Sequence, residues 1–416
     1  MGIDRLRVIR AYVAARRYQA RGMTREGLER RQRKLWRDFA PVIARTPALA
    51  HLTGKPLEDF PIVRPEEIRR DFARWNTLGL SKLAAEAAAA EAESGGSGEV
   101  VAGVSAGFST GTSDVRGVFL ASADERAEYL GQALARLLPW DGVLRRRRIA
   151  LCLRADSALY RDVGNAGPFA FRFFGLGVPV PELQRELAAF DPHVFVAPSH
   201  VLAALARAGE RVRSLERVFY GAEPMGALER AWIGTQIVVR PDPIYQATEG
   251  FLGAACIHGT LHLNEDTLII ERQPVAGTDR FQPIVTDLRR TTQPMVRVLL
   301  DDLLQARDAP CPCGSPLASV EPVEGRVGDL WRWGDVVIAP REVEAAVSGA
   351  VGADVDWRVV GGTRQVTVEI DRAMADRAVE AVRALLRERA VDLPVADAAL
   401  GPMAGFKRRR VTFADA

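Results

Sequence analysis

The sequence predicts an α/β protein: a large domain with mostly parallel sheets flanked by helices plus a β-unit, and a small α+β domain at the C-terminal end. Helical and strand patterns alternate through the middle of the chain, short apolar strands alternate with turns over about 251–320, and the composition changes near residue 330. A chain of 416 residues can hold two domains. We expect a large one over 1–325 and a small one over 326–416.

The N-terminal third is predicted to be mainly helical. Residues 4–49 place apolar side chains at helical spacing, and Pro65, followed by two glutamates, is typical of a helix start. The alanine-rich segment 84–93 and the amphipathic segment 125–140 are also predicted helices. Between these two lies a glycine- and serine-rich stretch that runs into FSTGTSDVRG at 108–117.

The middle of the chain alternates between strands and helices. The predicted strands are 148–155, 193–199, 217–225 and 235–241, and the predicted helices are 199–209 and 229–234. Ser199 is a candidate N-cap and Gly209 a candidate stop for the helix between them. This rhythm favours parallel strands joined by crossover helices. The later strands LHLNEDTLIIERQ and FQPIVTDL are expected to pair antiparallel, and the last 90 or so residues to form the small α+β unit.

Composition and charge exclude several classes of protein. The 56 basic residues nearly balance the 53 acidic ones, and a net charge of +3 does not favour nucleic acid as a partner. The run Arg145–Arg148 is expected to be a solvated strand end. No apolar stretch reaches the ~20 residues of a membrane span, and the N-terminus lacks the apolar core of a signal peptide. We therefore expect a cytoplasmic protein with no membrane and no nucleic-acid partner.

The loop at 109–113 consists entirely of small hydroxyl residues and glycine: Ser109, Thr110, Gly111, Thr112 and Ser113. Glycine permits close backbone approach, successive N–H groups can form an anion-binding concavity, and hydroxyls add neutral donors. The loop matches neither GxxxxGK[ST] nor GxGxxG. By itself it therefore fits either an oxyanion-binding loop or a flexible linker.

Further polar groups follow predicted strands. The segment IYQATEG places Tyr245, Thr248 and Glu249 at a strand end, where ligands collect in open α/β sheets. A carboxylate near a hydroxyl-rich loop suits a magnesium-bound triphosphate. The turn GAEP at 221–224 could frame a flat adenine, and Asp302 could accept hydrogen bonds from ribose hydroxyls.

Two motifs complete the series: EGRVGD at 324–329, which suits a hinge, and AGFKRRRV at 404–411. In this order the motifs resemble those of the adenylate-forming superfamily of acyl- and aryl-CoA ligases. More narrowly, the chain resembles the phenylacetate–CoA ligase branch and relatives that adenylylate a deazaflavin coenzyme. DFPIVRPEEIRRDFARWNTLGL, FDPHVFVAPSHVLAALA and CPCGS extend the resemblance over nearly the whole chain.

The resemblance implies an adenylate-forming large domain with a mobile C-terminal lid, and it implies roles for individual residues. It assigns Ser109, Thr110, Gly111, Thr112 and Ser113 to the nucleotide phosphates, Gly221, Ala222 and Glu223 to adenine, Tyr245 and Thr248 to the nucleotide site, Glu249 to Mg²⁺ and Asp302 to ribose. Arg326 matches the arginine after the hinge glycine, with Asp329 near the pivot, and Lys407 matches the catalytic lysine.

The chain departs from the family pattern at three places. The phosphate loop ends SDVRG, where many relatives have T-G-x-P. Asp301 replaces a glycine, which leaves both Asp301 and Asp302 as candidates for the ribose. Lys407 lies in GFKRRR rather than in G-K, which leaves its register open.

The cysteines predict a metal site. Cys256 precedes the C-x-C pair Cys311 and Cys313, and in a reducing compartment such a cluster indicates a metal before a disulfide. Zn²⁺ takes four sulfur or nitrogen ligands in a tetrahedron. His262 or His258 would supply the fourth, and His262 is preferred because it lies inside the strand-like LHL. Members of this branch carry a similar structural zinc, which would leave no open position for catalysis.

The function implied is ATP-dependent activation of a small carboxylic acid to an acyl-adenylate, followed by transfer to CoA or to a phosphopantetheinyl carrier protein. By resemblance the acid is aromatic, and the ring-rich segment 159–177 is either a pocket wall or core packing. Attack on the α-phosphorus develops negative charge that a mobile ammonium and Mg²⁺ would stabilise. The alternatives are an adenylyltransferase whose AMP adduct is the product, and a non-catalytic nucleotide-binding relative.

Overall fold

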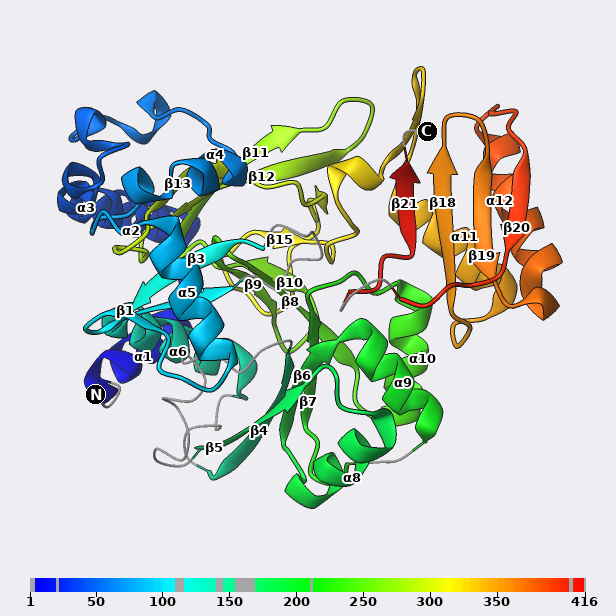
Figure 1. The fold of residues 1–416 in the computed structure, drawn as a ribbon, viewed down its shortest axis with the longest axis horizontal. Coiled ribbons are helices and arrows are strands. Elements are labelled where there is room, and N and C mark those ends of the chain that lie inside the picture. The colour runs from blue at the N-terminus through cyan, green and yellow to red at the C-terminus, as the bar shows by residue number, and fades with distance from the viewer. Residues whose placement is uncertain are drawn as a thin grey trace.

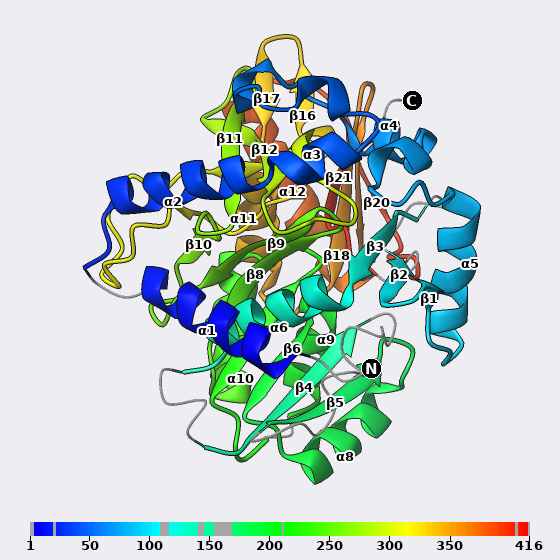
Figure 2. The ribbon, with the colours of Figure 1, turned by 90° about the vertical axis from the view of Figure 1, so that its left-hand side faces the viewer.

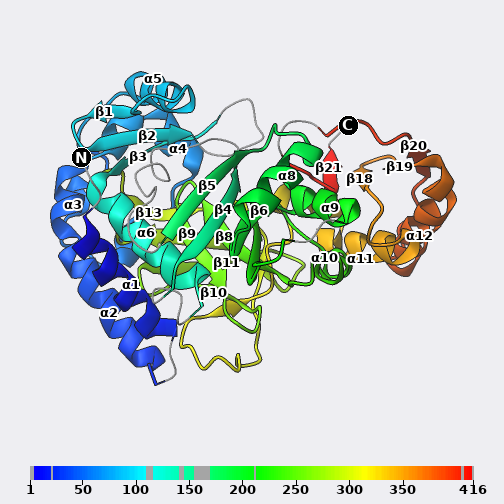
Figure 3. The ribbon, with the colours of Figure 1, turned by 90° about the horizontal axis from the view of Figure 1, so that it is seen from below.

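In the computed structural model the chain forms a large α/β part and a C-terminal unit beside it (Figure 1). The structure describes residues 4–19, 22–108, 116–139, 145–153, 169–209, 212–403 and 407–414. Figure 3 shows the N-terminal helices at one end of the molecule and the C-terminal unit at the other. No helix within these described ranges is long and apolar enough to cross a membrane.

The first part of the chain is helical, as predicted. Its helices are α1 (Arg5–Gln19), α2 (Arg25–Asp38), α3 (Ala40–Arg45), α4 (Pro65–Arg70), α5 (Lys82–Glu93) and α6 (Ala123–Leu137), with the short 3₁₀ helices η1 (Ala50–Leu52), η2 (Leu57–Asp59) and η3 (Phe72–Trp75). Thr24 and Ser81 cap helices α2 and α5. Helix α1 lies along α6 (Figure 2), where a methyl group at Gly131 would lie 2.3 Å from the carbonyl oxygen of Val8.

An eight-stranded sheet forms the centre, in the order β15-β10-β9-β8-β7-β6-β4-β5. Its strands are β4 (Arg147–Leu153), β5 (Phe169–Gly175), β6 (Val194–Pro198), β7 (Arg217–Gly221), β8 (Pro241–Ala247), β9 (Gly250–Ala255), β10 (Leu261–Leu263) and β15 (Ser319–Val320). Pairing is parallel from β5 to β8 and antiparallel from β8 to β15. The predicted parallel sheet is therefore present, and it continues directly into the β-unit.

Helices cover both faces of the parallel half. Helices α8 (Val180–Phe190), α9 (Ser199–Ala208) and α10 (Ala227–Ile237) lie along one face (Figure 3). They bury Leu187, Leu202 and Ile233 there. Helix α6 buries Leu134 against the other face, with α1 behind it. Burial on both faces explains the continuous apolar runs that predicted these strands.

Two local predictions are wrong. Residues 235–241 do not form a strand, because α10 continues to Ile237, Val238 takes a left-handed conformation, and β8 begins only at Pro241. The β-branched residues there suit a strand, but they complete the helix and its turn. Ser199 does not cap α9: it is the first helical residue, and its hydroxyl donates to the carbonyl of Pro224 at 3.0 Å. Gly209 ends that helix, as predicted, with φ at 77°.

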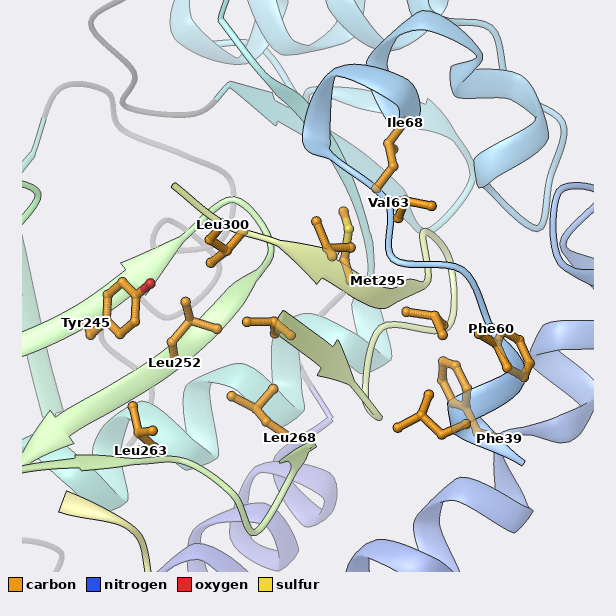
Figure 4. Packing of buried hydrophobic residues seen from close by; sticks show 14 of the residues in the cluster. Phe39, Phe60, Val63, Ile68, Tyr245, Leu252, Leu263, Leu268, Met295 and Leu300 are labelled. Carbon is orange, nitrogen blue, oxygen red and sulfur yellow. The ribbon is translucent and has the colours of Figure 1, made fainter. Parts of the chain in front are cut away.

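Smaller antiparallel sheets flank the centre. One contains β1 (Glu99–Val101), β2 (Val104–Phe108) and β3 (Val118–Ser122), and the other β11 (Leu268–Pro274), β12 (Arg280–Asp287), β13 (Met295–Leu299) and β14 (Leu304–Gln305). The second sheet shares a core with β8–β10 and the N-terminal helices (Figure 4). In it the ring of Tyr245 packs beside Leu252, and Phe39 and Phe60 pack at the far side.

The C-terminal unit has its own core. It comprises the 3₁₀ helix η4 (Val327–Asp329), β16 (Trp331–Trp333), β17 (Val336–Ile338), α11 (Pro340–Val351), β18 (Trp357–Gly362), β19 (Val366–Ile370), the 3₁₀ helix η5 (Arg372–Met374), α12 (Ala375–Glu388), β20 (Val395–Ala398) and β21 (Val411–Ala414). The four-stranded sheet has the order β20-β19-β18-β21. Trp331, Trp357 and Val382 are buried in its cluster. This is the α+β unit that the sequence predicts.

Candidate active site

Strand β8 places Tyr245 at the centre of the site. Its ring is buried in the core, and its hydroxyl donates a hydrogen bond to Oδ2 of Asp302 at 2.6 Å. Burial, and then the negative charge of Asp302, raise the pKa of Tyr245 well above its usual value. The phenol therefore stays protonated and holds the Asp302 carboxylate in a fixed orientation.

Asp302 interacts with groups from three other segments of the chain, of which Tyr245 is one. It forms an isolated antiparallel bridge with Arg326, which directly precedes η4. Burial raises the pKa of Asp302, while the Tyr245 hydrogen bond and the charges of Arg326 and Lys407 oppose that rise. Lys407 of the C-terminal unit therefore lies close enough to act electrostatically on this carboxylate.

The two adjacent aspartates point to different surroundings. The side chain of Asp301 is 56% exposed and lies 3.5 Å from Nη1 of Arg64. Asp302 faces Tyr245 and the two cations. Geometry therefore favours Asp302 as the group that faces a ligand, although Asp301 shares the sequence motif.

Glu249 lies in the turn between β8 and β9, and only 9% of it is exposed. Burial raises its pKa to about 7, and the charge of Asp302 adds to the rise, while Arg290 and Arg69 oppose it. A buried carboxylate with so high a pKa is costly to ionise, and a divalent cation would relieve that cost. The donor chemistry at Glu249 therefore fits the predicted magnesium role.

The surroundings of Glu249 include residues that the motifs do not reveal. Nη1 of Arg290 donates to the carbonyl of Thr248 at 2.9 Å and so fixes the turn. Asp287, at the end of β12, lies so close that a methyl group at Gly250 would be 2.8 Å from its Oδ2. Burial raises the pKa of Asp287 to about 6. TDLRR contains both Asp287 and Arg290, but only the fold brings them to Glu249.

The turn after β7 contains Gly221, Ala222 and Glu223, the residues matched to adenine. Ala222 has φ at 69°, which sharply turns the chain at the end of the strand. The Glu223 carboxylate accepts the backbone N–H of His200 at 3.2 Å, pairs with the His200 ring and accepts the backbone N–H of Arg408 at 2.6 Å. Glu223 therefore connects this turn to α9 and to the segment after Lys407.

The predicted phosphate loop, Ser109, Thr110, Gly111, Thr112 and Ser113, lies outside the described residues, and its role stays a prediction. The ring-rich segment 159–177 is described only from residue 169. There Phe169, Phe171 and Phe173 pack with the α6 side of the sheet, and Phe174 is buried on the opposite side. The described rings therefore serve the core of the sheet.

The predicted metal ligands come together. Cys256, His262, Cys311 and Cys313 each offer one ligand atom, and all four atoms lie within 4.8 Å of one another. The sulfurs of Cys256 and Cys311 are 3.6 Å apart, and Sγ of Cys313 is 3.4 Å from Nε2 of His262.

The orientation of the His262 ring also suits a metal. Its Nδ1 lies 2.9 Å from the carbonyl oxygen of Leu317. A carbonyl can only accept, so Nδ1 carries the proton and Nε2 presents its lone pair to the sulfurs, as in histidine metal ligands. Of the two histidines that the sequence left open, His262 joins the cluster and His258 does not.

Comparison with known proteins gives a likeness in structure only. No family model matches the chain, and no curated protein matches its sequence. Solved structures do match. 2-Hydroxyisobutyryl-CoA ligase in the postadenylation state, in complex with R3-HIB-AMP, has a TM-score of 0.67 at 20% identity, over 96% of this chain and 91% of the ligase. Anthranilate CoA ligase with anthranoyl-AMP has a TM-score of 0.52 at 12% identity, over 72% of this chain and 64% of that one.

The chain therefore has the fold of the adenylate-forming acyl- and aryl-CoA ligases, as its motifs predict. The likeness also depends on the state of the relative. For 2-hydroxyisobutyryl-CoA ligase the TM-score is 0.67 in the postadenylation state, 0.57 in an open conformation and 0.51 in the thioesterification state. The overall likeness in fold is thus highest, among these three, for the postadenylation structure.

Proposed function

We propose that this protein uses ATP and Mg²⁺ to convert a small carboxylic acid into an acyl-adenylate and then transfers the acyl group to a thiol. One observation carries the proposal: Asp302 accepts a hydrogen bond from Tyr245 and forms a backbone bridge with Arg326, at a place where the charge of Lys407 opposes the rise of its pKa. These residues come from four separate segments. Their meeting in this fold supports the roles that the motifs imply.

In the first half-reaction a carboxylate oxygen of the acid attacks the α-phosphorus. The new O–P bond forms as the bond to pyrophosphate breaks. Lys407 and Arg326 stabilise the negative charge that develops, and Asp302, held by Tyr245, accepts the ribose hydroxyls. Ser109–Ser113 hold the phosphates through N–H and hydroxyl donors. Mg²⁺ would be held by Glu249 and would supply positive charge beside the leaving group.

We also propose two domains and a structural zinc. Residues 1–325 would form the large domain and 326–416 a mobile lid, which the separate core around Trp331 and Trp357 supports. The four-residue cluster Cys256, His262, Cys311 and Cys313 would hold Zn²⁺ in a closed Cys₃His site. Such a site would stabilise the β-unit and take no part in the reaction.

In the second half-reaction the acceptor would be CoA or a phosphopantetheinyl carrier protein. CoA appears with 2-hydroxyisobutyryl-CoA ligase, which makes it the first acceptor to test. An aromatic acid is the first substrate class to test, on the family resemblance. The described rings of 169–175 do not argue for it, because they pack on the central sheet. We expect the protein to act in the cytoplasm.

The test is ATP–pyrophosphate exchange, with no thiol present, against a panel of aryl and short aliphatic acids. Strong exchange with one acid would establish adenylation and name the substrate class. Adding CoA or a carrier protein to the same reaction then identifies the acceptor. A stable AMP adduct that neither thiol consumes would instead indicate an adenylyltransferase, and ATP binding without exchange a non-catalytic protein.

Lys407→Ala should lower exchange by about 100-fold or more while leaving ATP binding, measured by calorimetry, largely unchanged. The matched control is Lys34→Ala, which removes a lysine that pairs with Asp38 on the exposed side of α2. Normal exchange in the Lys407 variant would contradict the assignment.

A further inference from the structure

Each of the three arginines that follow Lys407 contacts a carboxylate. Arg408 binds Glu229 with both terminal nitrogens, at 2.7 Å each, and donates to the hydroxyl of Ser199 at 3.0 Å. Arg410 also contacts Glu229, at 3.1 Å. Arg409 turns the other way, to Asp329 in η4.

These contacts cross from one part of the molecule to the other. Ser199 is in α9 and Glu229 is in α10, both on the large part. The arginines belong to the C-terminal unit, where Asp356 also contacts Arg408 at 3.3 Å and Arg410 at 3.5 Å. Figure 1 shows the last strand, β21, beside β18, with α10 and α9 below it, and α10 contacts α11 of the C-terminal unit. Arg408 and Arg410 therefore span the junction between the parts.

The acceptor of both arginines is fully buried. Glu229 has 0% exposure, so its ionised carboxylate depends on its partners for compensation. A two-point contact between a guanidinium and a carboxylate is both strong and directional. The backbone N–H of Arg408, the residue next to Lys407, is fixed in addition by Glu223 at 2.6 Å. The position of Lys407 is thus set by contacts one residue away.

Rotation of the C-terminal unit would break this arrangement. It would separate Arg408 and Arg410 from Glu229 together, because both are on the moving side. The cost of leaving Glu229 without them opposes opening, and closing restores the contacts.

We propose that Glu229, Arg408 and Arg410 form a latch that holds Lys407 beside Asp302 for adenylation and that must open before the thiol step. Arg408 is then a positioning residue that acts through Lys407. The inference rests on the proposed function, since it divides that function into a step that needs the latch closed and a step that needs it open.

The test measures the two half-reactions separately. Adenylation is followed by ATP–pyrophosphate exchange, and the thiol step by thioester formation from supplied acyl-adenylate and CoA. Glu229→Gln and Arg408→Gln should each lower exchange by about tenfold or more and leave the thiol step within about threefold of wild type, or faster. The double variant should lose little beyond either single one, because the two residues act as a pair.

The control is Arg387→Gln, the same substitution on the same unit, at an arginine whose ion pair with Glu380 lies at the exposed surface of α12. It should leave both half-reactions unchanged. Arg408→Gln leaves the buried Glu229 carboxylate without its main partner and can unfold the protein. If this variant is unfolded, the test relies on Glu229→Gln instead. Equal losses in both half-reactions, or normal exchange in Glu229→Gln, would overturn the latch.

A second readout separates failure of the latch from failure of the proposed function. If the wild-type protein shows no pyrophosphate exchange with any acid of the panel, the proposed function fails. Small-angle X-ray scattering then still tests the latch. If the latch holds the C-terminal unit closed, the Glu229→Gln variant should have a larger radius of gyration than the wild type and the Arg387→Gln variant. Equal radii for all three proteins would overturn the latch.

Discussion

The pKa of Glu249 leads to a measurable release of protons on nucleotide binding. In the free protein, burial raises this pKa to about 7, so below pH 7 the carboxyl group is mainly protonated. Mg²⁺ binds only the ionised form. Binding of magnesium and ATP should therefore expel the proton, and affinity should fall as the pH decreases below 7.

The size of the effect follows from that pKa. A group that titrates at about 7 is roughly half protonated at pH 7, about nine-tenths at pH 6 and about one-tenth at pH 8. The number of protons released per nucleotide bound should take the same three values. Glu249→Gln cannot ionise and should release fewer protons by these amounts at each pH.

The assay is titration calorimetry with saturating Mg²⁺ in buffers of different ionisation enthalpy, which gives the number of protons released. Subtracting the Glu249→Gln variant removes protons from ATP and from other residues. Equal release by wild type and variant at pH 6 would refute the reasoning, since Glu249 would then be ionised already or distant from the metal. Release that stays constant from pH 6 to pH 8 would refute it as well.

Three further predictions concern ribose, zinc and helix packing. Asp302→Asn should raise the KM for ATP by about tenfold or more in the exchange assay, whereas Asp301→Asn, at an exposed position, should leave it unchanged; the reverse result would exchange their roles. Wild-type protein should contain about one zinc per chain by elemental analysis, and Cys311→Ser should reduce this content and lower the Tm. Wild-type protein that contains no zinc when it is prepared without chelators would contradict the zinc proposal. Gly131→Ala should lower stability by about 1–3 kcal/mol, because its methyl group would meet the backbone of α1 at 2.3 Å. Gly349→Ala, on α11, should be neutral or stabilising in the same thermal unfolding experiment, because beyond the local helix backbone its methyl group would meet no atom within 4 Å.

The sequence predicts most of this fold, because hydrophobic periodicity and turn residues act locally. Gly209 ends its helix as expected, since glycine readily takes a left-handed conformation. The failure at 235–241 has the opposite cause. There the β-branched residues favour a strand, yet the helix continues to Ile237. It ends at Val238, which adopts a left-handed φ of 62°. Tertiary packing decides such short segments.

The site divides in the same way. Glu249 and Lys407 can be found from motifs whose residues are adjacent in sequence. Glu229 cannot: it is 179 residues from Arg408, and in the sequence a glutamate within a predicted helix cannot be distinguished from a solvated charge. Only the fold buries it and brings the arginines to it. The metal ligands are intermediate, because cysteine is rare enough here, with four in the chain, to stand out despite separation.

The contacts of the KRRR run make its length as important as its composition. Arg408 and Arg410 reach Glu229, and Arg409 between them reaches Asp329, so successive side chains alternate between two sides, as in an extended strand. Deleting or inserting one residue after Lys407 would exchange the two sides, even though the run would remain basic. A point substitution removes the contacts of one arginine, whereas a single-codon insertion would misplace the contacts of all three at once. Natural relatives of this protein should therefore vary the residues of this run more readily than its length.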